Sequence, residues 1–245
     1  MELFITFILG VFVLAGALVA GLAKDEERIR EASIAVALGA ILVLLVLDLA
    51  PEAVEGVGAI GWPLTVVAAV IGFLVLVLLD RFLPESPGTG HRAHASNSAL
   101  HISIVTTIAL SIHNVIEGMS VYGVATQSLS TALMLAFGIG IHNVPMGMIV
   151  YSGVRGQSVF RRGVVMGVAV LSTFVGGLVM FALGSNVDDG IVSFMVALTI
   201  GLLLYIITCE LLPHVLHAHD RRLSFLGFLV GAALVLAGVF IAKLA

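Results

Sequence analysis

The chain has 245 residues, of which 60% are hydrophobic and only 11% are charged. Soluble domains carry roughly 25% charged residues, and the mean hydropathy here is +1.19, so a soluble globular fold is excluded. The weak net charge of −4 identifies no partner, and no nucleic acid is expected to bind. We expect an all-α integral membrane protein in which a single transmembrane domain occupies residues 1–245 and contacts the lipid bilayer.

Eight apolar stretches are long enough to cross a bilayer, which takes roughly 20 residues of helix. They are expected at 3–23, 32–54, 61–82, 99–122, 130–153, 162–183, 190–213 and 223–243. The first stretch has no basic region before it and no clear cleavage site, so it is interpreted as a span and not as a signal peptide. The longest connection, at about 83–98, is rich in proline and glycine and is expected to be a cytoplasmic linker.

The positions of the basic residues predict how the spans are oriented. Ten of the eleven Lys and Arg residues lie in the connections after spans 1, 3, 5 and 7, and only Lys243 lies elsewhere. Basic residues collect in cytoplasmic loops. Both termini are therefore expected outside the cytoplasm. The membrane itself is expected to be a plasma (inner) membrane.

One motif occurs in two neighbouring spans. The fourth span contains I-H-N-V-I-E-G-M, and the fifth contains I-H-N-V-P-M-G-M. His113 and Glu117 are four residues apart, which places them on one helix face about 6 Å apart along the axis. His142 and Met146 repeat this spacing. Ionisable side chains deep in a membrane cost free energy and usually mark a transport pathway or a binding site. These two spans are therefore predicted to bind one metal ion between them.

The residue types in this motif favour a divalent transition metal. Imidazole suits Zn, Fe, Ni and Cu. Two imidazoles and one carboxylate form a set typical of an open zinc site, with a fourth position for Met146 or water. Asn114 and Asn143 directly follow the histidines and are candidates for orienting the ligands or supplying carbonyl oxygens. The alternatives are that Met146 fills apolar space and that the asparagines hydrogen-bond between helices.

A second pair of motifs predicts the ends of a transport path. The second span ends in D-L-A-P-E, which includes Asp48 and Glu52, and the seventh ends in C-E-L-L-P-H, which includes Cys209, Glu210 and His214. Each motif has an acid three residues before a proline, at opposite faces of the membrane. Together with the antiparallel motifs of spans 4 and 5, they predict an inverted repeat of three, two and three spans, with the substrate at the midplane.

The H-N-x-x-E-G and H-N-x-P-x-G segments resemble the signature of the ZIP (Zrt/Irt-like) metal transporters. The span number, the outside termini, the histidine-bearing loop after span 3 and the E-x-x-P of span 7 are similar as well. The resemblance covers essentially the whole chain. It implies a homodimer, without a prosthetic group or enzymatic activity, that carries divalent metal toward the cytoplasm. Zn2+ is the expected cargo, with Fe2+, Co2+, Ni2+ and Cd2+ as alternatives.

The resemblance also implies roles for individual residues. By position, the two histidines and the glutamate match the primary-site ligands of the family, and Asn114 and Asn143 match the neighbouring second site. The family usually has Glu where this chain has Met146 and Pro where it has Ile116, and span 6 at 162–183 lacks the carboxylate that is common there. We therefore expect a single-metal site that disfavours hard cations such as Mg2+ or Mn2+. In the family, spans 1, 4, 5 and 6 are thought to move against spans 2, 3, 7 and 8.

Two other functions compete with transport. A non-transporting metal sensor or receptor would be compatible with the loss of the carboxylate at Met146. An intramembrane metal-dependent hydrolase would use the same metal for chemistry. The order H-N-x-x-E, however, lacks a glutamate between two histidines that could act as general base, unlike H-E-x-x-H.

Overall fold

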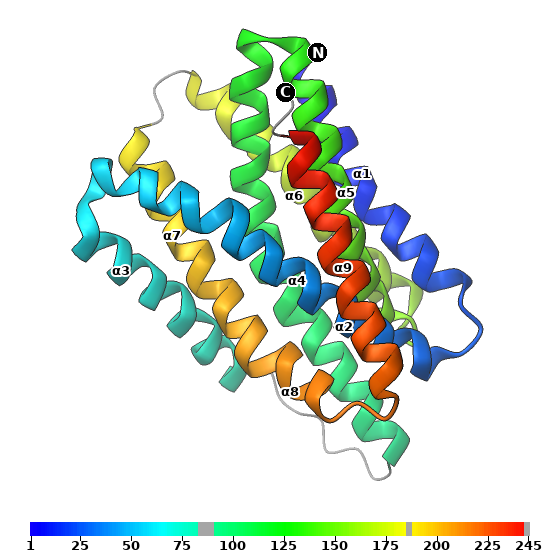
Figure 1. Ribbon diagram of the computed structural model, residues 1–245. Coiled ribbons are helices and arrows are strands. Elements are labelled where there is room, and N and C mark those ends of the chain that lie inside the picture. The colour runs from blue at the N-terminus through cyan, green and yellow to red at the C-terminus, as the bar shows by residue number, and fades with distance from the viewer. Residues whose placement is uncertain (83–90, 185–187, 243–245) are drawn as a thin grey trace.

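The computed structural model describes residues 1–82, 91–184 and 188–242, and these form a bundle of long helices (Figure 1). No strand occurs in those three ranges, which together with the apolar helices confirms the all-α membrane fold. The helices are α1 (Glu2–Leu22), α2 (Glu26–Leu44), η1 (Leu45–Leu49), α3 (Ala50–Phe82), α4 (His91–Gln127), α5 (Leu129–Val154), α6 (Val159–Leu183), α7 (Asp189–Tyr205), η3 (Ile206–Leu211), α8 (Leu212–Leu216) and α9 (Arg221–Ala242).

Side chains at the helix starts explain where several elements begin. The side chain of Asp25 accepts backbone N–H bonds at the start of α2, as Ser128 does for α5, Ser158 for α6 and Asp188 for α7. Asp220 does the same for α9, and the N–H groups of Leu223 and Arg222 hold the pKa of its carboxyl below the usual range. Such caps satisfy N–H groups that have no partner inside the helix.

The predicted linker at about 83–98 is shorter than expected at its carboxyl-terminal end. Residues 83–90 lie outside the described part of the chain, and helix α4 already begins at His91. The prolines and glycines that predicted a linker all precede His91, and the segment H-R-A-H-A-S-N-S that follows contains no helix breaker. The helix therefore extends about two turns before the expected membrane span.

A break at Gly61 divides the longest apolar segment. Seven described segments are long and apolar enough to cross a membrane, and one of them, Glu26–Arg81, has 56 residues. A straight helix of that length would extend about 84 Å, far more than a hydrocarbon core of about 30 Å. Gly61 has φ 77° and ψ 152°, a backbone conformation that glycine adopts without steric cost. In Figure 1 the chain before this break and the chain after it run in opposite directions.

Two π-helical turns occupy matching positions in the two acid–proline motifs. In η1 the N–H of Ala50 bonds the carbonyl of Leu45, and in η3 the N–H of Leu212 bonds the carbonyl of Ile207. A proline follows each turn within two residues. Because proline has no N–H for the regular ladder, a wider turn is a way to pair the neighbouring groups, and such turns are frequent at functional sites.

Glycines allow the helices that carry the histidine motifs to approach their neighbours closely. A Cβ at Gly118 in α4 would overlap the carbonyl oxygen of Thr173 in α6, and one at Gly147 in α5 would overlap that of Val13 in α1. Helix pairs in membranes associate through such small residues. As a result α4 packs along α6 and α5 along α1, whereas α3 packs on α7 and α2 on α9.

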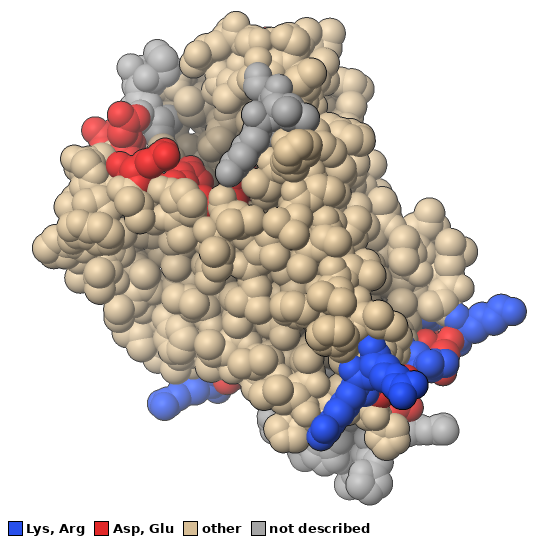
Figure 2. Space-filling model, viewed as in Figure 1, with Lys and Arg blue, Asp and Glu red and all other residues tan. Residues whose placement is uncertain are grey.

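The two ends of the bundle differ in charge. The start of α1 and the end of α9 lie at the upper end in Figure 1. Figure 2 shows basic side chains only along the lower edge of this face, while a group of acidic side chains without basic neighbours lies near the upper left, over the start of α7. We call the upper end the terminal end and the lower end the basic end.

Replacement of Gly118 by alanine tests the close packing of α4 on α6. The added methyl group would overlap a backbone carbonyl oxygen, which cannot move without the helix, so we expect a loss of about 1–3 kcal/mol, as for other overpacked interiors. The measurement is thermal unfolding of the purified protein in detergent. Gly167→Ala in α6 is the matched control, because a Cβ there meets nothing within 4 Å. Equal destabilisation by both changes would contradict the packing.

Candidate metal centre

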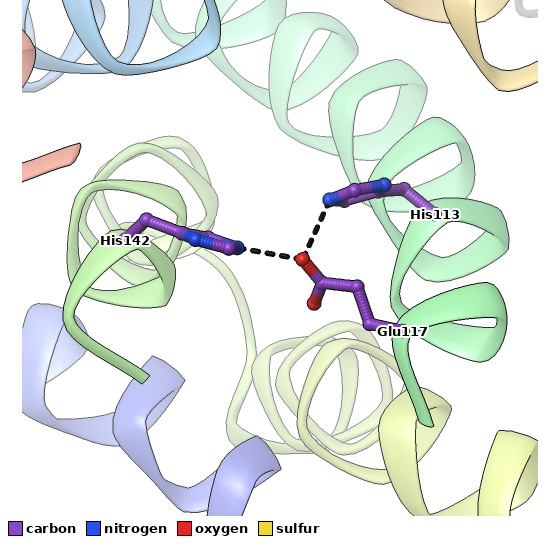
Figure 3. Close-up of side chains that lie close together, drawn as sticks. All are labelled: His113, Glu117 and His142. Carbon is purple, nitrogen blue, oxygen red and sulfur yellow. Dashed lines mark hydrogen bonds and ion pairs between the residues drawn. The ribbon is translucent and has the colours of Figure 1, made fainter. Parts of the chain in front are cut away.

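Three ionisable side chains meet between two helices in the interior of the bundle. His113 and Glu117 come from α4 and His142 from α5, with 2%, 7% and 3% of their surfaces exposed. The Oε1 atom of Glu117 lies 2.9 Å from Nε2 of His113 and 2.7 Å from Nε2 of His142 (Figure 3). One nitrogen or oxygen from each residue lies within 4.8 Å of the others. We call this group the His–Glu–His triad.

Several polar atoms in and beside the triad lack a hydrogen-bond partner among the described residues. Nδ1 of His113, Oε2 of Glu117 and both amide atoms of the neighbouring Asn143 belong to this group. Buried polar atoms are nearly always paired, and each unpaired one costs about 1–3 kcal/mol. A cation site requires unpaired polar atoms close together, because the lone pairs of imidazole and carboxylate are then available as ligands.

The two asparagines after the histidines have different surroundings. The Nδ2 of Asn114 donates to Oγ of Ser172 at 3.1 Å and to the carbonyl of Ala169 at 3.4 Å, both on α6. Asn143 is fully buried, and its amide makes no hydrogen bond to the residues whose side chains the structure describes. Asn114 therefore links α4 to α6 through its amide nitrogen and keeps Oδ1 unpaired, whereas Asn143 keeps its whole amide available.

Met146 lies one turn beyond His142 on α5 and is 2% exposed. It belongs to the main cluster of buried hydrophobic side chains. It does not line the cavity that reaches the triad. The thioether thus has the surroundings of a packing residue.

A cavity of about 270 Å3 reaches the triad from the side of Asp48 and Glu52. Asp48 belongs to η1 and Glu52 to the first turn of α3. Beyond Glu52 lies an open hollow of about 550 Å3, which we call the outer vestibule. It is lined by Glu52, Glu55, Gly56, Gly58, Ala59, Asp189, Val192 and Ser193. The acids that the sequence placed at the start of a path therefore adjoin the cavity.

A second group of possible ligands lies where α3, α4 and η3 meet. Nε2 of His101 is 2.6 Å from Oδ1 of Asp80 and 3.5 Å from Oε1 of Glu210. We call this the inner group. Sequence reasoning selected Glu210 but not the other two. No fixed spacing connects residues on three different helices, and the only available signal was that each is ionisable and lies near the end of an apolar span.

The other two residues selected for the inner path do not join this group. Cys209 is exposed, and its Sγ lies 3.6 Å from Oγ1 of Thr208. The Nδ1 of His214 lies 2.6 Å from the backbone carbonyl of Glu210. Adjacent residues of a helix point about 100° apart, so residues 209 and 210 lie on different faces and Glu210 is the one that points toward His101.

The chain is similar to known zinc transporters over most of its length. Residues 85–237 match the family model described as ZIP zinc transporter. Over 222 residues the chain is 28% identical to the zinc transporters ZupT of Enterobacter sp. (strain 638), Escherichia fergusonii and Salmonella enteritidis PT4. Each of these alignments covers 86% of this chain and 85% of the relative.

Replacement of Glu117 by glutamine tests the triad as a metal site. The change keeps the shape of the side chain and replaces the carboxylate with a neutral amide, so we expect Zn2+ affinity to fall by about 100-fold, or about 2.7 kcal/mol. Isothermal titration of the purified protein with Zn2+ measures this loss. Glu27→Gln, at an exposed position of α2, is the control and is expected to bind as the unchanged protein does. Unaltered affinity in Glu117→Gln would exclude the triad as the principal site.

Proposed function

The chain belongs to the ZIP zinc transporter family, and we propose that it carries Zn2+ toward the cytoplasm through the His–Glu–His triad between α4 and α5. The observation that carries this proposal is the convergence of His113 and His142 on one carboxylate oxygen of Glu117. Imidazole and carboxylate ligands together suit a cation of intermediate softness such as Zn2+. Fe2+, Co2+, Ni2+ and Cd2+ suit the same ligands and are the alternative cargoes.

The ion approaches the triad through the outer vestibule. Glu52, Glu55 and Asp189 line this hollow, and a hollow lined by one sign of charge concentrates ions of the opposite sign. Asp48 and Glu52 then line the cavity between the vestibule and the triad. At the triad, two imidazoles and a carboxylate replace water molecules of the hydrated ion, which offsets the cost of entering the apolar interior.

The inner group receives the ion after the triad. Asp80, His101 and Glu210 supply two carboxylates and an imidazole, and the exposed fractions of the first two side chains are 38% and 18%. A site nearer to water holds a cation less strongly than a buried one because water competes for it. The basic end of the bundle faces the cytoplasm, both termini lie outside, and the segment broken at Gly61 crosses twice, which gives eight spans.

The triad holds one ion, not two. On α6, Ser172 accepts a hydrogen bond from Asn114, and this helix contains no carboxylate. Met146 stands among core side chains, away from the cavity lining. A second divalent ion on the side of the triad that faces α6 would therefore have only amide and hydroxyl oxygens as new ligands, which is too little charge to offset repulsion from the first ion.

Movement of two groups of helices against each other would open the triad to each side in turn. Helices α1, α4, α5 and α6 contact one another extensively, and α3 with α7 and α2 with α9 form the other packed pairs. Contacts of α5 with α9 and α2 join the groups. The matching π turns at Asp48 and Glu210 support an inverted repeat of three, two and three spans, with a homodimer in the inner membrane as the working assembly.

Uptake of radioactive zinc into proteoliposomes tests transport directly. We expect the unchanged protein to accumulate Zn2+ and His142→Ala to reduce the initial rate at least about tenfold, since one of three ligands is lost. His217→Ala is the matched control, because His217 is exposed and outside both ligand groups. Tight binding of Zn2+ without uptake under any gradient would favour a sensor or receptor, and metal-dependent cleavage of peptide or lipid would favour a hydrolase.

Counting bound ions tests the single-metal centre. We expect one tightly bound Zn2+ per triad, which Mn2+ displaces poorly, because Mn2+ prefers carboxylate ligands. Residues 142 and 146 share one face of α5, and a carboxylate at 146 would be driven from the apolar core toward the triad. Met146→Glu is therefore expected to raise the uptake of Mn2+ relative to Zn2+ by about tenfold. Elemental analysis of Glu210→Gln protein, compared with the unchanged protein, separates ions at the inner group from those at the triad. Two tightly bound ions that both depend on Glu117 would contradict the proposal.

A further inference from the structure

A second cavity lies between α4, α6 and α7, beside the one that reaches the triad. Its volume is about 240 Å3, and three of the eight methionines of the chain line it. Met119 comes from α4, Met180 from α6 and Met195 from α7. The remaining lining residues are Ile116, Ser120, Gly123, Val124, Gln127, Asp189 and Val192. We call this cavity the methionine pocket.

Methionine usually fills irregular space in an apolar core, but here the three side chains surround space instead of filling it. Met119 is buried and the other two are half-buried. Gly123 contributes to the same space, since a Cβ built there would meet only the methyl carbon of Met180, at 3.8 Å. Methionine side chains from three helices therefore line one volume that can admit a ligand.

The residue types that line the methionine pocket favour one class of cation. Thioether sulfur is a soft, neutral ligand that favours Cu+ over Zn2+ and over harder divalent ions. Asp189 supplies a carboxylate at the edge of the pocket, and Gln127 and Ser120 supply neutral oxygens. One carboxylate balances one positive charge, so the set suits a monovalent soft cation.

The methionine pocket adjoins the route proposed for zinc. Asp189 and Val192 line both the pocket and the outer vestibule, and Glu52 lines both the vestibule and the cavity of the triad. A cation attracted by the vestibule can therefore reach either a set of imidazole and carboxylate ligands or a set of thioethers.

We propose that the methionine pocket binds a soft monovalent cation, Cu+ or Ag+, at a site separate from the His–Glu–His triad. Its ligands belong to both packed groups of helices: Met119 and Met180 lie on α4 and α6, and Met195 lies on α7. The bound ion joins these groups at the vestibule. On the proposed transport function, it therefore slows zinc uptake without competing for the triad.

The test counts Ag+ ions bound to the purified full chain by native mass spectrometry, since Ag+ is stable in air and needs no reductant. The test variant combines Met119→Leu, Met180→Leu and Met195→Leu, which keeps the apolar volume and removes the thioethers. The control combines Met134→Leu, Met148→Leu and Met166→Leu, three methionines outside the pocket. Cys209 and the histidines are present in all proteins and bind Ag+ alike, so the difference between variants reports the pocket.

We expect the test variant to bind one Ag+ fewer than the unchanged protein and the control variant to bind the same number. Gly123→Leu, which fills the space and leaves every thioether in place, is also expected to lose one Ag+. Zn2+ titration of each variant shows that the triad, and hence the fold, is intact, and it separates failure of this proposal from failure of the zinc site. An unchanged Ag+ count in the test variant, an equal loss in the control, or retention of a lipid or detergent molecule in place of Ag+ would overturn the proposal.

The inhibitory consequence has its own readout in proteoliposomes. Ag+ is expected to lower the maximal rate of zinc uptake at least about fivefold without changing the zinc concentration at half-maximal rate. The test variant is expected to resist this inhibition. Inhibition of equal strength in the test variant, or inhibition that zinc relieves, would overturn the link between the pocket and movement of the helices.

Discussion

A carboxylate held between two imidazoles in an apolar interior is the constraint on which the rest of the structure depends. Glu117 lies within 3 Å of ring nitrogens from two different helices, and all three side chains are almost completely buried. Isolated ionised groups cannot stay at that depth without pairing. Helices α4 and α5 must therefore stay at a fixed distance from each other and at a fixed orientation about their own axes. The glycine contacts of α4 with α6 and of α5 with α1 serve this purpose, because close contact between backbones leaves little freedom to rotate or slide.

Polar groups elsewhere in the bundle extend from this point in two directions. Toward the terminal end, Asp48 and Glu52 lead to the acidic vestibule. Toward the basic end, His101 joins Asp80 and Glu210. Each direction passes a π-helical turn next to a proline. In such turns the backbone ladder is already irregular, so small changes in helix geometry cost less there than in a regular helix.

The differences between expectation and structure have identifiable physical causes. The predicted end of the linker, at about residue 98, was too late in the sequence because composition changes gradually along the chain. The helix begins at His91, directly after the last of the helix-breaking prolines and glycines. The inner path was assigned by proximity in sequence, which grouped Cys209 with Glu210. In a helix adjacent residues point about 100° apart, and only Glu210 reaches His101. Asp80 and His101 were overlooked because their helices are brought together by packing that no local pattern records.

Composition, the apolar spans and the repeated H-N motif were enough to establish a helical membrane protein of the ZIP family and to select the three residues that meet at the triad. These properties follow from hydrophobicity and from the period of one helix, and both can be read along a single segment. The inner group, the break at Gly61, the core position of Met146 and the gathering of three methionines around one cavity depend on how helices pack against one another. Packing is decided by shape and close contact between segments distant in the chain, and that information exists only once the bundle has formed.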